Sequence, residues 1–179
     1  MNLLDKFMNG RKSRLPESII LCAAASLAGM FYYSEHFYGE TVHTVICLVL
    51  TAVIAAMWLI CAACCGRDGR YGFVIFAFLY HSVPFFYTLW YSGRDNLHNY
   101  NKWLAMGNKA AKALLLDPFR EASARLGCEP VLLAAILLSA VMCTYIAALL
   151  IKRNYDNRAS VRDDEIPEQD VEYTTQEKR

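Results

Sequence analysis

The chain has 179 residues, of which 56% are hydrophobic, and its formal net charge is only +1. This length allows a single domain, and the near balance of charge gives no argument for a nucleic-acid partner. The apolar residues form long blocks separated by short polar joints, whereas a soluble fold would show amphipathic periods. The composition therefore excludes an ordinary soluble domain and predicts an all-α, polytopic membrane protein.

Four apolar segments are each expected to cross a membrane as a helix, because about 20 apolar residues match the ~30 Å hydrocarbon core of a bilayer. The first segment has the shortest apolar run. It follows a basic N-terminus but lacks a small-residue cleavage site, so we interpret it as an uncleaved span rather than a signal peptide. The expected spans cover residues 17–36, 42–65, 71–91 and 130–151, which gives a four-helix membrane domain over residues 1–153.

The distribution of basic residues predicts the orientation. Lys and Arg residues precede the first span, occupy the short joint between spans two and three, and follow span four. The joint 34–41 contains no Lys or Arg. The positive-inside rule therefore places both termini and the middle joint in the cytoplasm. Six Lys or Arg residues in the long outer joint 92–129 oppose this assignment, but longer loops have less weight in the rule.

Small side chains recur along several of the expected spans, and in span four they recur every four residues. Membrane helices associate through close packing of small residues, since lipid is as apolar as leucine. We expect these stripes to hold the four helices together, and the alternative is that one stripe builds a homo-oligomer. The positions expected at helix contacts are Ala25, Gly29, Ala135, Ser139, Cys143 and Ala147.

The third span is rich in aromatic residues and carries the polar group of greatest interest. His81 lies near its middle, and Pro84 leaves the carbonyl four residues earlier without its helical hydrogen bond. An ionisable residue inside a membrane is a functional hypothesis by default. The alternative is a neutral histidine bonded across the bundle, to Thr144 or Tyr145. The intramembrane polar candidates are His81, Ser82, Pro84, Ser139 and Thr144.

The long outer joint 92–129 is predicted to contain two short amphipathic helices. On a helical wheel of residues 101–116, the lysines lie opposite an apolar face, and Asp117-Pro118 then resembles a helix start. These helices either lie on the outer leaflet and contact lipid, or they pack over the end of the bundle. The interfacial candidates are Lys102, Trp103, Lys109 and Lys112.

The remaining sequence offers no cofactor or metal site. Zinc would need a second pair of ligands beside Cys61-x-x-Cys64-Cys65, and only Cys128 lies on the outer, oxidising side of the membrane, so we expect neither a metal nor an intramolecular disulfide. Residues 154–179 are acidic and lack apolar periodicity, which predicts a disordered cytoplasmic tail. No phosphate-binding loop, nucleophile elbow or zinc-protease motif is present.

These observations favour a non-enzymatic membrane protein: a small subunit, assembly factor or scaffold. Its expected partners are the lipid bilayer and either other membrane proteins or copies of itself, without nucleic acid. The second hypothesis is an oligomeric channel or transporter-like conduit with a polar path around His81. The third is a membrane enzyme that acts on lipid, and it is less favoured because no carboxylate lies in the interior of a span, away from its ends, to assist a base.

Overall fold

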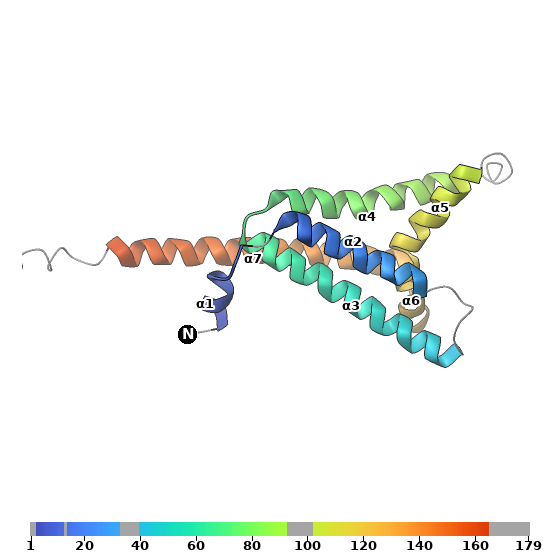
Figure 1. The fold of residues 1–179 in the computed structure, drawn as a ribbon, viewed down its shortest axis with the longest axis horizontal. Helices are drawn as coiled ribbons and strands as arrows, with labels where there is room; N and C mark the ends of the chain where they lie inside the picture. The colour runs from blue at the N-terminus through green and yellow to red at the C-terminus, as the bar shows by residue number, and fades with distance from the viewer. Residues whose placement is uncertain (1–2, 13, 33–39, 93–101, 165–179) are drawn as a thin grey trace, which may run out of the picture.

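The computed structural model describes residues 3–12, 14–32, 40–92 and 102–164, and all the regular secondary structure in these ranges is helical. Four long helices form the body of the molecule: α2 (Leu15–Tyr32), α3 (Glu40–Arg67), α4 (Tyr71–Ser92) and α7 (Pro130–Asp164). Helices α2 and α4 run in one direction, while α3 and α7 return in the other (Figure 1). Helix α1 (Leu3–Met8) lies near the end where α2 and α4 begin (Figure 1).

Three helical segments are long and apolar enough to cross a membrane: Val42–Arg67, Tyr71–Tyr91 and Pro130–Ser160. They contain the expected spans 42–65, 71–91 and 130–151, so the prediction of an all-α, membrane-type fold is confirmed. In α2, the apolar segment Leu15–Ser26 is shorter than a full crossing. Residues 33–36 of the expected first span lie outside the described residues, and the fourth crossing stays a prediction.

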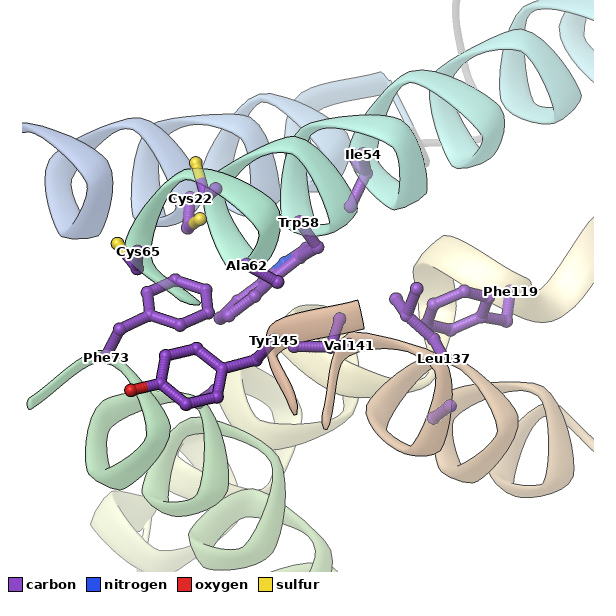
Figure 2. Close-up of a cluster of buried hydrophobic side chains, with 13 residues drawn as sticks. Cys22, Ile54, Trp58, Ala62, Cys65, Phe73, Phe119, Leu137, Val141 and Tyr145 are labelled. Atoms are coloured by element: carbon purple, nitrogen blue, oxygen red, sulfur yellow. The ribbon is translucent and has the colours of Figure 1, made fainter. Parts of the chain in front are cut away.

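The core of the molecule is centred on Trp58 of α3, which is 1% exposed (Figure 2). Its ring stacks on Phe76 of α4, with centroids 5.8 Å apart, and also contacts the rings of Phe73 and Tyr80. Each such aromatic pair contributes about 0.5–1.5 kcal/mol beyond the burial of its area. The aromatic face of α4 therefore attaches this helix to α3, while Val141 from α7 closes the other side of the core (Figure 2).

Helices α3 and α7 approach most closely at Gly66. A Cβ atom built on Gly66 would collide with the backbone carbonyl oxygen of Tyr145 and would lie 3.1 Å from the Cβ atom of Ala148. Only glycine allows the two backbones to meet at this distance, which is how membrane helices commonly pack. Helix α3 ends at Arg67, and Gly69 follows two residues later with a φ of 66°, in the left-handed region that favours glycine.

The end of the bundle at which α4 finishes is covered by the segment between α4 and α7, which corresponds to the predicted outer joint and is called the outer segment. It contains α5 (Lys102–Leu115), the 3-10 helix η2 (Asp117–Phe119) and α6 (Arg120–Leu126), as seen at the right of Figure 1. Helix α6 ends at Gly127, which has a φ of 65°, and the amide of Cys128 then donates to the carbonyl of Ser123 over 3.1 Å. This left-handed ending turns the chain into α7.

Helix α7 extends beyond the rest of the bundle (Figure 1) and continues as a helix to Asp164. This corrects the expectation of a disordered tail for residues 154–164, whereas residues 165–179 lie outside the described residues. The sequence contains no glycine or proline from residue 131 to residue 166 that would end the helix. In addition, the Lys152 Nζ atom lies 2.7 Å from Asp156 Oδ1, one helical turn away.

We expect Gly66→Ala to lower the free energy of unfolding in detergent by about 1–3 kcal/mol, because the new methyl group meets backbone that cannot rotate away. The unfolding temperature should fall accordingly. Gly72→Ala is the matched control, since its Cβ atom meets only the mobile end of the Leu15 side chain, at 2.8 Å. Equal unfolding temperatures for the two variants would contradict a backbone contact at Gly66.

Candidate functional site

His81 is buried, with 6% of its surface exposed, and it is satisfied by its own helix. Its Nδ1 atom lies 2.8 Å from the carbonyl oxygen of Ala77 and donates to it when it carries the proton. The imidazole also meets Trp58 edge-on, with centroids 4.9 Å apart. The hydroxyl of Tyr145 has no hydrogen-bond partner in the described part of the chain, so the suggested bond between His81 and Tyr145 does not form.

A cavity of about 180 Å³ opens between α4 and α7 beside His81. We call it the α4–α7 groove. Apart from His81 and Ser82, its lining is apolar, and this lining is made of His81, Ser82, Phe85, Val131, Ala134, Ala135 and Leu138. The groove is thus a mainly apolar recess with polar groups on one wall only.

The other intramembrane polar candidates do not line this groove. Ser139 is exposed, and its hydroxyl donates to the carbonyl of Ala135 over 2.9 Å, so it is satisfied by its own helix. Thr144 lies more than one turn further along α7. Pro84 lies within α4, which continues through it, and it is partly buried. The structure therefore brings together His81 and Ser82, and it does not assemble the five candidates into one polar path within a single chain.

The small-residue stripe of α7 faces away from the bundle. Ala135, Ser139, Cys143 and Ala147 are all exposed. The buried face of α7 is the neighbouring one, formed by Ala134, Leu137, Val141, Tyr145 and Ala148. This corrects our expectation that the stripe packs within the chain: at the close α3–α7 contact, Gly66 of α3 meets Ala148, which lies on the buried face of α7 and not on the stripe. On α2, Ala25 does pack against the core, and the surroundings of Gly29 lie outside the described residues.

The outer segment is fixed to the end of the bundle by both apolar and polar contacts. Phe119 is 7% exposed and joins the core cluster. The hydroxyl of Thr51 donates to the carbonyl of Pro118, and the hydroxyl of Thr44 lies 3.4 Å from Glu121 Oε2. Residues of α3 thus hold η2 and α6 in place, in agreement with the packing alternative for this segment.

Helix α5 has three distinct faces rather than two. Asn108 and Ala111 are buried against the body of the molecule, and the hydroxyl of Tyr87 donates to the carbonyl of Leu104 over 3.1 Å. A second face is apolar and exposed, with Trp103 at 79% and Met106 at 61%. The third face carries three exposed lysines, which are Lys102, Lys109 and Lys112.

Asp117 begins η2 at the junction of these short helices. Burial raises the pKa of its carboxyl group, while the nearby Arg120 and Lys112 act in the opposite direction. A raised folded-state pKa means that ionisation opposes folding, so this contribution to stability is lost as the pH rises above the unfolded-state value. The two basic neighbours limit this cost near neutral pH.

Arg67 is the polar residue that the sequence analysis missed. Its side chain is 6% exposed and lies at the end of α3, where its Nε atom is 2.7 Å from Asp68 Oδ1. The Nη1 and Nη2 atoms donate to the carbonyls of Phe7 and Arg11, over 2.8 Å and 2.7 Å. The guanidinium group also lies over the Phe7 ring, 5.2 Å from its centroid. This Arg67 clamp fixes the N-terminal segment against the α3–α4 turn.

The cysteines form contacts but no bonds to one another. The Cys61 thiol of α3 lies 4.0 Å from the carbonyl oxygen of Ser18 in α2, and no disulfide bond joins any two of the seven cysteines, all of which lie in the described part of the chain. Among the described residues, no group of three His, Cys, Asp or Glu side chains is placed to hold a metal ion.

The fold and these sites define a class: an all-α protein with at least three helices suited to a membrane and with several open surfaces. Comparison with known proteins found no family model that matches the chain, and no curated protein or solved structure with significant similarity to it.

We expect Arg67→Lys to release the N-terminal segment. A lysine cannot donate in two fixed directions, and a hydrogen bond to a charged group contributes about 1.5–3 kcal/mol. Trypsin should then cleave after Arg11 or Lys12 roughly tenfold faster than in the wild-type protein. Arg70→Lys is the control, because Arg70 is exposed and outside the clamp. An unchanged cleavage rate in Arg67→Lys would show that the clamp does not hold this segment.

Two tyrosine substitutions should have opposite effects. Tyr145→Phe removes a buried hydroxyl without a partner, so we expect an equal or higher unfolding temperature in detergent. Tyr87→Phe removes the bond to the Leu104 carbonyl and should cost about 1 kcal/mol. A marked loss of stability in Tyr145→Phe would mean that its hydroxyl has a partner after all.

Proposed function

We propose that this chain is a small, non-enzymatic membrane protein that crosses the bilayer four times and binds a helix of another membrane protein. Its role is that of a subunit, assembly factor or scaffold. The single observation that carries the proposal is the α4–α7 groove, which is open, mainly apolar and bordered by small side chains.

The fourth crossing is argued from α2. This helix has 18 residues and runs antiparallel to α3 (Figure 1), and its Cys22 and Ser26 side chains are fully buried in the bundle. An even number of crossings places both ends of the chain on one side. That arrangement agrees with the basic residues before α2 and after the apolar part of α7, and it puts these ends in the cytoplasm.

The groove suits a helix better than an ion. His81 bonds to its own backbone and Ser82 is the only other polar side chain in the lining, so an ion would find little to replace its water. By contrast, Ala135 lines the groove and begins the exposed stripe Ala135, Ser139, Cys143 and Ala147. Small side chains at this spacing let a second helix approach the α7 backbone, and van der Waals contact drives association in lipid.

Helix α5 also supports the proposed membrane orientation, in which α5 lies at the outer surface of the bilayer. Its exposed apolar face, with Trp103 and Met106, lies beside the exposed lysines, which is the pattern of a helix in the membrane interface. In this proposal the apolar face enters the acyl boundary and the lysines lie among the headgroups. The buried face of α5, with Asn108 and Ala111, remains packed against the body of the molecule, and Tyr87 of α4 donates to the Leu104 carbonyl.

The proposal is tested by photo-crosslinking from a residue in the groove. A photoreactive side chain at Ala135 should give an adduct with one defined membrane protein, whereas the same group at Ala56, exposed on α3, should react with lipid only. Ala135→Leu should lower the yield of the co-purified partner by roughly tenfold, because added volume in a helix contact costs about 1–3 kcal/mol. Ala56→Leu should leave it unchanged.

The other outcomes decide against the proposal. An adduct between two copies of the chain would favour the homo-oligomer instead. Lipid adducts alone at both positions would remove the groove as a protein-binding surface.

A further inference from the structure

A cluster of cationic side chains that the proposed function does not use lies at the end where α2 and α4 begin. A cavity of about 610 Å³ opens there, within the range of about 300–1,000 Å³ that is common for ligand sites. We call it the basic cleft. Its charged lining consists of Arg11, Lys12, Arg14, Glu17 and Arg70, and its apolar lining consists of Leu15 and Pro16.

Acidic side chains among the described residues do not balance the charge of the basic cleft. Four cationic side chains face one carboxylate, which leaves a net charge of +3 (four minus one). Arg14 pairs with Glu17, with Nη1 and Oε1 3.1 Å apart. Arg11, Lys12 and Arg70 form no ion pair with any acidic side chain in the described part of the chain, and all three are exposed. The cleft therefore attracts an anion.

The basic cleft is built by contacts that hold its two walls in fixed positions. One wall is the segment before α2, and the Arg67 clamp holds the carbonyl of Arg11 there. Gly10 lets the clamp approach, since a Cβ atom at Gly10 would lie 2.9 Å from Arg67 Nη1. The other wall is the α3–α4 turn, where the amide of Arg70 donates to the carbonyl of Cys65 over 2.9 Å.

The position of the basic cleft selects the kind of anion. Helices α2 and α4 both begin on its rim, at Leu15 and Tyr71, so the cleft lies where the hydrocarbon core would give way to the headgroups. Tyr71 is 67% exposed, and aromatic rings settle at this level of a bilayer. This step rests on the proposed membrane orientation, which places the cleft on the cytoplasmic side. Anionic lipids are enriched in that leaflet.

We propose that the basic cleft binds the phosphate headgroup of an anionic phospholipid. The guanidinium groups of Arg11 and Arg70 donate to the phosphate oxygens in the paired geometry that arginine prefers, and Lys12 adds a third cation. Leu15 and Pro16 contact the apolar part of the same lipid next to its headgroup. The chemistry that is recognised is a phosphodiester carried at the membrane surface.

The test uses the purified full-length chain in detergent, without any partner protein. Soluble short-chain phosphatidylglycerol is titrated, and binding is followed by native mass spectrometry and by the rise in unfolding temperature. The variant Arg11→Gln/Lys12→Gln/Arg70→Gln should bind at least about tenfold more weakly than the wild-type chain. The matched control Lys102→Gln/Lys109→Gln/Lys112→Gln removes the same charge from exposed lysines of α5 and should bind as the wild-type chain does.

Two further binding measurements identify the ligand. Phosphatidylcholine, which carries the phosphate but no net charge, should bind at least about tenfold more weakly than phosphatidylglycerol. Inorganic phosphate at the same concentration should displace little of the lipid. Complete displacement would make the cleft a site for free phosphate and would overturn the lipid assignment. Equal binding by the two triple variants would overturn the cleft itself.

This test separates the lipid site from the proposed function. Lipid binding is measured without a partner protein, so the absence of a crosslink at Ala135 does not affect it. Conversely, loss of the lipid site leaves the α4–α7 groove untouched, because the groove and the cleft share no lining residue.

Discussion

The close contact of α3 with α7 is the constraint on which the rest of the structure depends. Gly66 removes the side chain that would separate the two backbones, and the larger residues of α7 then fill the space around Trp58. Once α3 and α7 are joined, α2 packs on the other side of α3 and α4 attaches through its aromatic face. The contact also determines which face of α7 is used inside the chain and which face stays open.

Several features of this fold can be predicted from the sequence. Long apolar runs predict the three helices that are able to cross a membrane, because the thickness of the hydrocarbon core sets the length of a crossing. The start of α7 follows from Pro130, which suits the first turn of a helix. The two helices of the outer segment follow from the alternation of lysines with apolar residues and from Asp117-Pro118.

The expectations that the structure corrects also failed for physical reasons. In a helix that is apolar on every side, periodicity cannot show which face is buried, so the small-residue stripe of α7 was assigned to the wrong side. Tail residues up to Asp164 were expected to be disordered from their polarity, but a helix that is already formed extends easily through residues without glycine or proline. The basic cleft was missed because its two walls, near residues 11–17 and at Arg70, come together only through the Arg67 clamp.

The length of α7 has a mechanical consequence. Thirty-five residues in one helix make a rod of about 52 Å, well beyond the ~30 Å of the hydrocarbon core. A rod of this kind does not bend freely between its two ends, so a torque or tilt applied to its C-terminal part is transmitted to the face beside Ala135. The side chain of Asn9 approaches the ring hydroxyl of Tyr155 at 3.5 Å, so the N-terminal segment contacts the same continuous helix that carries Ala135.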